Sequence, residues 1–213
     1  MLLLGVETAL EIELDSLTFR LVSPTDALFG ARLLFGGSFD PPHIGHQALL
    51  ESLTTEFPDA TLTLIPVHKH AFGKTLAPFE FRYRWCELLA KSIDSRIEVS
   101  NIESSLDGSS LSTAQHFHAL EPGRRLVWVI GSDLLPTLSG WTGANILSQL
   151  VEFCVFQRAG ARASKSSVSR AVDLPEISST DLRADLACGN VPRNGIPKVI
   201  LDDFLKDNPY LDQ

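Results

Sequence analysis

Short apolar segments alternate with amphipathic segments along most of this chain. From Arg32 onward, apolar runs predict strands near residues 32–36, 61–66, 96–99, 125–130 and 151–156. Apolar residues at helical spacing predict intervening helices near residues 44–56, 79–93, 111–120 and 143–149. Because alternating strands and helices form parallel sheets with right-handed crossovers, we expect an α/β fold, a Rossmann-like doubly wound parallel sheet. Ligands bind such folds beyond the carboxyl ends of the strands.

Both ends of the chain depart from this alternation. Residues 10–22 alternate apolar and polar side chains, which predicts a hairpin or edge strand within an N-terminal extension, residues 1–30. The main domain is then residues 31–213. Helical patterns at 179–187 and 197–211 predict a small C-terminal helical region within this domain, residues 176–213.

Composition narrows the class of protein. Apolar residues make up 44% of the 213 residues and charged ones 21%, as in ordinary globular domains. The net charge of −8 disfavours nucleic-acid binding. We find no signal peptide and no apolar run of the roughly 18 residues that a membrane span requires, so we expect a cytoplasmic protein. The basic stretch 158–170 is typical of a surface loop, either a solvated linker or a flap that contacts phosphate.

The three cysteines, Cys86, Cys154 and Cys188, are far apart and lack C-x-x-C spacing. This arrangement argues against both a disulfide framework and a zinc site. Cys86 and Cys154 lie within apolar runs that predict core positions.

The segment "GGSFDPPHIGH", residues 36–46, follows a predicted strand and opens a predicted helix. Gly36 and Gly37 let the backbone turn sharply and approach a ligand. The N–H groups of the helix's first turn attract anions. His43 and His46 lie three apart, hence on one helical face, where both can donate to phosphate oxygens. A zinc site there lacks a clear third ligand beyond Asp40, so we expect no metal bound by these side chains.

A second phosphate motif is "ISSTDLR", residues 177–183, at a predicted helix start. Its hydroxyls can cap the helix or bind phosphate oxygens. Arg183 lies in the first turns, where its guanidinium can make a charge-assisted contact.

Together the two motifs resemble the H-x-G-H and S-S-T-x-x-R signatures of the nucleotidyltransferase superfamily, and specifically those of bacterial nicotinate mononucleotide adenylyltransferases. The segment "IGSDLLPTLSGW", residues 130–141, resembles the family's G-x-D…W segment. The segment "SSLSTAQHF", residues 109–117, resembles its S-Y-T-A-Q-T segment, with Ser112 in place of the tyrosine. The resemblance covers the chain from about Arg32 to the C-terminus and implies a nucleotidyltransferase domain over residues 31–213.

The resemblance implies two adjoining binding sites. The ATP site comprises Gly36, Gly37, Ser38, Phe39, Asp40, His43, His46, Gly131, Asp133, Ser178, Ser179, Thr180 and Arg183. The mononucleotide site comprises Lys74, Thr113, Asp133 and Trp141. Trp141 would stack on the pyridine ring, and the main-chain N–H of Thr113 would bind its carboxylate. The family's P-P-H-K loop corresponds here to "PVHKHAFGK", so either His68 and Lys69 or His70 and Lys74 take its place.

The implied reaction joins ATP and nicotinate mononucleotide into nicotinate adenine dinucleotide and pyrophosphate, a step of NAD biosynthesis, with Mg²⁺ accompanying ATP. No protein nucleophile is required, so catalysis consists of positioning and charge stabilisation. We assign the charge developing at the α-phosphate to His46, bridging oxygens to His43 and the leaving pyrophosphate to Arg183. The oligomeric state stays open, a homo-oligomer included.

Other functions are weighed against this one. A class I aminoacyl-tRNA synthetase also carries "HIGH", but this chain is short for one and its acidity disfavours tRNA. A related transferase would use another acceptor, such as nicotinamide mononucleotide or pantetheine phosphate, or would transfer a cytidylyl group. A non-enzymatic nucleotide-binding protein is disfavoured because both phosphate motifs are complete.

Overall fold

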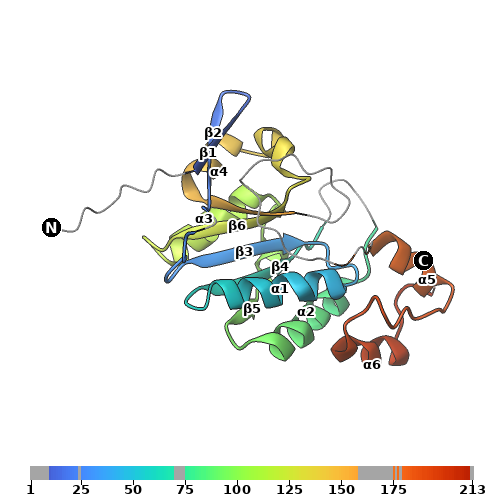
Figure 1. Cartoon of the computed structure of the whole chain (residues 1–213). Helices are drawn as coiled ribbons and strands as arrows, with labels where there is room; N and C mark the ends of the chain where they lie inside the picture. Colours follow the sequence, from blue (N-terminus) through green and yellow to red (C-terminus); the bar gives the residue numbers. More distant parts are fainter. Residues whose placement is uncertain are drawn as a thin grey trace.

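One seven-stranded sheet runs through the molecule, in the order β1-β2-β7-β6-β3-β4-β5 (Figure 1). The computed structural model describes residues 10–23, 25–69, 75–157, 175, 177 and 179–211. The strands are β1 (Leu10–Leu14), β2 (Leu17–Leu21), β3 (Arg32–Gly37), β4 (Thr61–Pro66), β5 (Ile97–Val99), β6 (Leu126–Gly131) and β7 (Glu152–Phe156). The helices are α1 (Ile44–Glu56), α2 (Phe79–Ile93), η1 (Ile102–Ser105), α3 (Ser110–Leu120), η2 (Leu135–Gly140), α4 (Ala144–Leu150), α5 (Ser179–Ala187) and α6 (Lys198–Lys206).

Chain direction around the sheet places the ligand site. From β3 in the middle, the chain runs outward through β4 to β5, then returns to the other side of β3 for β6 and β7. All of these neighbouring strands pair in parallel. The strand order therefore reverses between β3 and β6, and ligands bind at such a switch point. The Rossmann-like doubly wound α/β fold that the sequence predicts is confirmed.

Two hydrophobic cores lie on opposite faces of this sheet. Alternation along β3 sends Leu33 and Phe35 into the core beneath α1 and α2, and Leu34 into the core beneath α3 and α4. The predicted core positions of Cys86 and Cys154 are confirmed, since both side chains are buried. Among the residues that the structure describes, no helix has the length and apolar character needed to cross a bilayer.

The N-terminal segment is an antiparallel hairpin of β1 and β2 that extends the sheet beyond β7. Phe19 of β2 is fully buried and packs edge-on against Phe153 of β7, with ring centroids 5.8 Å apart. The hairpin therefore contributes to the same core as the parallel strands.

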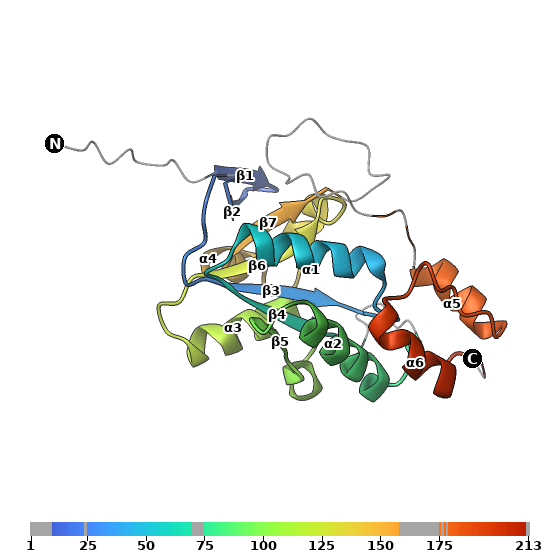
Figure 2. The same ribbon diagram turned by 60° about the horizontal axis from the view of Figure 1, so that its bottom comes forward.

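The C-terminal helices α5 and α6 lie beyond the arrowhead of β3, at the carboxyl end of the sheet, in both ribbon views (Figures 1 and 2). The helix predicted over 197–211 is too long, because α6 ends at Lys206. Residue 208 precedes Pro209, and a residue before proline disfavours the helical conformation. The shorter helix leaves residues 207–211 to form a turn.

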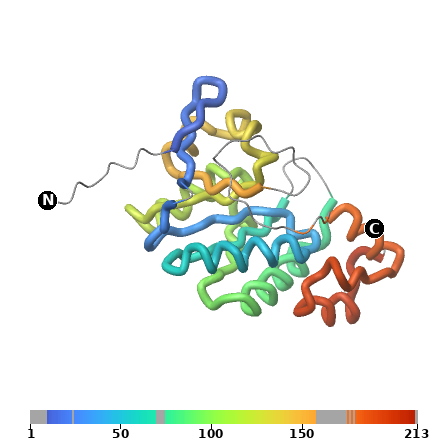
Figure 3. The backbone as a smooth tube through the Cα atoms, viewed as in Figure 1, coloured from blue at the N-terminus to red at the C-terminus, as the bar shows by residue number. Residues whose placement is uncertain are grey.

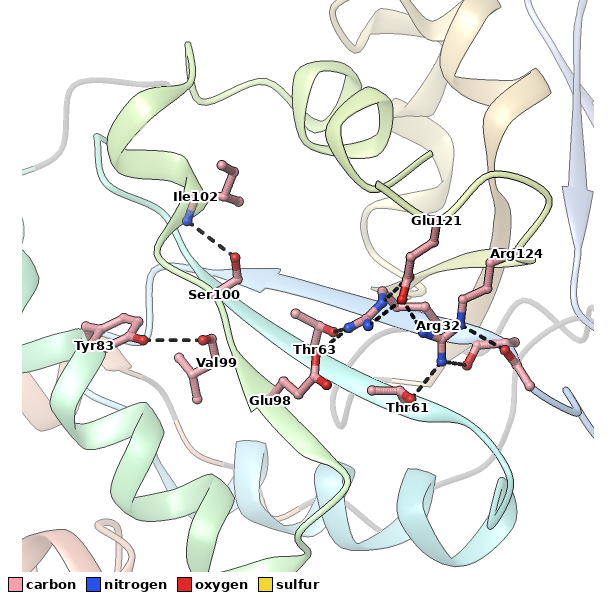
Figure 4. Close-up of polar contacts among 12 residues, drawn as sticks. Arg32, Thr61, Thr63, Tyr83, Glu98, Val99, Ser100, Ile102, Glu121 and Arg124 are labelled. Atoms are coloured by element: carbon pink, nitrogen blue, oxygen red, sulfur yellow. Dashed lines mark hydrogen bonds and ion pairs between the residues drawn. The ribbon is translucent and has the colours of Figure 1, made fainter. Parts of the chain in front are cut away.

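An ion-pair network at the opposite, amino-terminal end of the sheet surrounds Arg32 (Figure 4). Arg32 is 6% exposed, and its guanidinium donates to both oxygens of Glu121, at 2.6 and 2.9 Å. It also donates to Thr63 Oγ1 at 2.6 Å and to Glu98 Oε2 at 2.5 Å. Because Arg124 donates to Glu121 as well, two arginines lower the pKa of that carboxyl to about 2.

Replacing Glu121 by glutamine is expected to lower the free energy of unfolding by about 1–3 kcal/mol at pH 7, because a buried arginine loses a charged acceptor. A carboxyl with a lowered folded-state pKa stabilises the protein above its unfolded-state pKa, near 4.5 here, and loses that effect as pH falls toward the folded value. The difference in the free energy of unfolding between wild type and Glu121→Gln should therefore shrink as the pH is lowered from about 4.5 to about 2. Denaturant unfolding at a series of pH values measures it. The exposed Glu13→Gln is the control, and a difference independent of pH would contradict this account.

Candidate active site

A cavity of about 810 Å³ opens where β3 and β6 end. Most of the residues predicted for the two binding sites line it: Gly36, Gly37, Ser38, Phe39, His43, His46, Gly131, Asp133, Trp141, Ser179, Thr180 and Arg183. The fold thus brings motifs from distant parts of the chain to the switch point of the sheet. Of the remaining predicted residues, Lys74 and Ser178 fall outside the described part of the chain, as does the basic stretch 158–170.

The loop that leaves β3 packs closely over Gly37, the last residue of that strand. A Cβ on Gly37 would lie 3.2 Å from the ring of Phe39. Phe39 is 1% exposed, has a positive φ of 46° and packs edge-on against Phe35. A side chain at Gly37 would therefore displace the ring that anchors the loop in the core.

His43 and His46 lie next to each other at the start of α1, with ring centroids 3.7 Å apart. His43 is the N-cap of the helix, and its main-chain N–H donates to Nδ1 of His46 at 3.1 Å. A neutral imidazole whose Nδ1 accepts carries its proton on Nε2, so His46 is a hydrogen-bond donor through Nε2. The intervening Gly45 lets the His43 ring pack closely, since a Cβ there would lie 3.0 Å from that ring and would press on it.

Arg183 joins the two phosphate motifs directly. Its Nη1 donates to the main-chain oxygen of Asp40 at 2.9 Å and lies 3.7 Å from the Oδ2 atom of the same residue. Its Nη2 donates to Thr180 Oγ1 at 3.3 Å, within the first turn of α5. Ser179 and Thr180 line the cavity beside it. An arginine, two hydroxyl groups and a helix N-terminus therefore face the same space as the histidine pair, an arrangement that suits a polyphosphate.

At the end of β6, the side chain of Asp133 packs against Gly131, which has no Cβ atom. A Cβ on Gly131 would collide with Oδ1 of Asp133, because the chain turns back there with Leu134 N–H donating to the Gly131 carbonyl at 3.0 Å. This turn holds the Asp133 carboxylate at the cavity wall, next to the switch point.

Trp141 follows η2 and is half-buried at the cavity wall. Its indole Nε1 donates to Thr137 Oγ1 at 3.1 Å, which fixes the orientation of the ring. In the segment "PVHKHAFGK", Lys69 lines the cavity, whereas His70 and Lys74 are outside the described residues.

Thr113 differs from the expectation. Its main-chain N–H donates to the Ser109 carbonyl at 3.3 Å, as the regular bonding of α3 requires, and its hydroxyl donates to Glu103 Oε1. Thr113 is fully buried, so its N–H does not offer the predicted donor to a carboxylate. The cavity wall carries Ser110 instead, in the first turn of α3. N–H groups of a helix's first turn have no backbone partner within the helix, and in α3 the Ser109 Oγ atom accepts from the Ser112 N–H at 3.1 Å.

Glu103, in η1, is a cavity residue that the sequence reasoning missed. It is 5% exposed, and Oε2 has no hydrogen-bond partner in the described part of the chain. Burial raises the pKa of this carboxyl above the ordinary glutamate range. Its position in the segment between β5 and α3 is a signal in the sequence, because residues beyond the carboxyl ends of strands line the ligand site in this fold.

Metal ligands do not gather in the described residues, where no three His, Cys, Asp or Glu side chains could hold an ion. Mg²⁺ commonly keeps several waters and binds substrate phosphates through few protein ligands.

Residues 34–185 match the cytidylyltransferase-like family model. The chain is therefore a nucleotidyltransferase, the class of protein that its fold and its two motifs indicate. A probable nicotinate-nucleotide adenylyltransferase of Anaeromyxobacter dehalogenans is 35% identical over 79% of this chain and 90% of its own length. A probable nicotinate-nucleotide adenylyltransferase of Sulfurimonas denitrificans is 34% identical over 82% of this chain and 94% of its own length. The chain belongs to this adenylyltransferase family.

Structural comparison agrees on the fold. The nicotinic acid mononucleotide adenylyltransferase of Plasmodium falciparum, solved in complex with NaAD, superposes with a TM-score of 0.73. The match covers 86% of this chain and 98% of that one at 19% sequence identity.

Proposed function

We propose that this protein transfers the adenylyl group of ATP to nicotinate mononucleotide, forming nicotinate adenine dinucleotide and pyrophosphate in cytoplasmic NAD biosynthesis. The observation that carries the proposal is the meeting of both phosphate motifs and Trp141 at one cavity. A polyphosphate and a flat aromatic ring are the two chemical features that these side chains recognise. The names of the relatives point to the same pair of substrates.

In this reaction an oxygen of the mononucleotide's phosphate attacks the α-phosphorus of ATP. The bond from that phosphorus to the bridging oxygen breaks in line, and pyrophosphate leaves with the electron pair. The cavity needs no nucleophile of its own, because the substrate supplies one. His46 donates from Nε2 to the α-phosphate, where charge accumulates, and His43 beside it serves the bridging oxygens.

The leaving pyrophosphate is assigned to α5. Ser179, Thr180 and Arg183 present hydroxyl and guanidinium donors there, and the positive end of the helix dipole adds to them. Mg²⁺ bound to the triphosphate supplies further neutralisation of the developing negative charge. The protein groups themselves orient the phosphates.

The pyridine ring is assigned to the wall formed by Trp141 and the start of α3. Trp141 stacks on the ring, and first-turn N–H groups of α3, near Ser110, take the place that Thr113 was predicted to fill. Asp133 lines the same cavity just beyond the carboxyl end of β6, and we assign the nucleotide sugars to it.

The function is tested by incubating the protein with ATP and Mg²⁺ together with nicotinate mononucleotide. Dinucleotide and pyrophosphate are expected in equal amounts. Parallel reactions replace the acceptor by nicotinamide mononucleotide or pantetheine phosphate, and ATP by CTP. Faster product formation in one of those reactions would assign a different substrate, and no pyrophosphate from any of them would reject the enzymatic function.

Replacing Arg183 by lysine is expected to raise the KM for ATP by about tenfold, because lysine keeps the charge but loses the planar fork that binds phosphate and the Asp40 carbonyl together. Initial rates at varied ATP measure the change. The exposed Arg193→Lys, in the same C-terminal region, is the matched control and should leave KM unaltered. Wild-type ATP kinetics in Arg183→Lys would leave the hydroxyl motif as a helix cap only.

A further inference from the structure

Asp40 is a buried meeting point of three segments that are distant in the sequence. Its carboxylate is 1% exposed, and Oδ1 accepts from the Tyr210 hydroxyl at 2.7 Å and from Ala77 N–H at 3.0 Å. Its main-chain oxygen accepts from Arg183. Asp40 lies in the loop between β3 and α1, two residues after Ser38 at the cavity wall. The conformation of this phosphate-binding loop therefore depends on contacts from beyond the parallel sheet.

The C-terminal turn brings Tyr210 to this point. The Tyr210 ring, 1% exposed, stacks on Phe204 at 6.1 Å, and Phe204 stacks on Trp85 of α2 at 4.3 Å. Asn208 accepts from the Tyr210 N–H at 3.0 Å and donates to the carbonyl of Leu186 at the end of α5 at 2.8 Å. The same turn thus holds the helix that carries Arg183. Figure 3 shows the C-terminal segment returning to the carboxyl end of β3.

A second buried arginine fixes the backbone of the same loop. Arg82 is 1% exposed and donates from Nη1 to the Ser38 carbonyl at 2.9 Å and to the Val67 carbonyl at 2.8 Å. Its Nε donates to the Ala77 carbonyl at 2.9 Å. The Asp40 carboxylate accordingly lies near the positive charges of both Arg82 and Arg183. The orientation of the Asp40 carboxylate determines how close its negative charge lies to the buried Arg82 and to Arg183 at the cavity.

We propose that Tyr210 is a positioning residue of the phosphate site, whose hydroxyl holds the Asp40 carboxylate and, through it, the loop at Ser38 and the guanidinium of Arg183. The proposal rests on the proposed function for the identity of the ligand, ATP. Tyr210 is outside the set of described residues that line the cavity, so it acts through Asp40 and touches no substrate.

The hydroxyl is suited to this role because it remains a donor. Burial and the neighbouring Asp40 charge raise the pKa of Tyr210, so the phenol keeps its proton. Without the hydroxyl, Oδ1 retains only the Ala77 N–H. The carboxylate is then held less firmly, and the 3.7 Å pairing between its Oδ2 and Arg183 is expected to change. Displacing a phosphate-binding group by a fraction of an ångström weakens both binding and turnover.

The test is Tyr210→Phe, which removes the hydroxyl and keeps the ring in the aromatic stack. The chain's other tyrosine provides a matched control, because the Tyr83 hydroxyl also donates to protein, to the Val99 carbonyl at 3.3 Å, away from the cavity (Figure 4). In Tyr210→Phe the Kd for ATP with Mg²⁺, measured by calorimetry, should rise about tenfold and kcat should fall about tenfold. The KM for nicotinate mononucleotide should stay the same, and Tyr83→Phe should match wild type in all three.

A double-mutant cycle separates positioning from general stability. Adding Tyr210→Phe to Asp40→Asn should weaken ATP binding less than about twofold further, because the hydroxyl acts through that carboxylate. Full additivity, or an unchanged Kd and kcat in Tyr210→Phe, would overturn the proposal. The proposal would also be overturned if the losses of ATP affinity and kcat in Tyr210→Phe were fully explained by a smaller folded fraction, which thermal unfolding measures. If wild type binds ATP but adenylylates no acceptor, the proposed function fails while the ATP affinities still decide the role of Tyr210.

Discussion

Replacing His46 by alanine is expected to lower kcat by about 10²–10³-fold with little change in either KM. The negative charge at the α-phosphate grows most in the transition state, and a donor held in place beforehand acts mainly there. His46 is such a donor, because the His43 N–H occupies its Nδ1 and leaves Nε2 to carry the proton. Its side chain lines the cavity, so truncation is expected to remove a contact with the bound nucleotide.

Steady-state kinetics with both substrates varied measure this effect. The matched control is His118→Ala, which truncates an exposed histidine on α3 and should retain wild-type kcat. Circular dichroism and thermal unfolding should show the native fold in both variants. Near wild-type turnover in His46→Ala would mean that the α-phosphate binds elsewhere.

The second large effect is a preference for nicotinate over nicotinamide mononucleotide of at least about 10²-fold in kcat/KM. The acid presents two acceptor oxygens, whereas the amide presents one oxygen and an NH₂ group. If main-chain N–H groups at the start of α3 face this end of the ring, an amide NH₂ leaves a donor unpaired at about 1–3 kcal/mol. Glu103 lies on the same cavity wall, and burial raises the pKa of its carboxyl above the ordinary glutamate range, which lessens its repulsion of the substrate's carboxylate.

The preference is measured as kcat/KM for each mononucleotide at saturating ATP and Mg²⁺. Trp141→Ala should reduce kcat/KM for both acceptors by a similar factor, because stacking recognises the ring and not its substituent. Equal rates with the two acceptors would refute the assignment to nicotinate and leave adenylyl transfer intact. A Trp141→Ala loss confined to one acceptor would show that the indole contributes to discrimination.

Local patterns determined the elements and their order. The predicted bounds of α1, α2 and β4 agree with the structure. At the ends of these elements the spacing of apolar residues changes, and a proline or a turn lies next to the change. Pro78 precedes α2, and Pro66 closes β4. The two motifs that are predicted to bind phosphate also stand out in the sequence, since H-x-G-H and S-S-T-x-x-R place their side chains through short-range helix geometry. His43, Gly45 and His46 depend on one another within a single turn.

Contacts between distant segments were decided by the tertiary structure alone. Tyr210 and Asp40 are 170 residues apart, and nothing in either local sequence names the other as a partner. The Thr113 N–H was predicted to bind substrate, yet its helix register commits it to Ser109. Glu103 reaches the cavity wall because η1, which follows the edge strand β5, packs against β4. The physical reason is common to these cases: apolar spacing encodes which face of an element is buried, whereas the partner on that face follows from how the whole sheet and its helices pack.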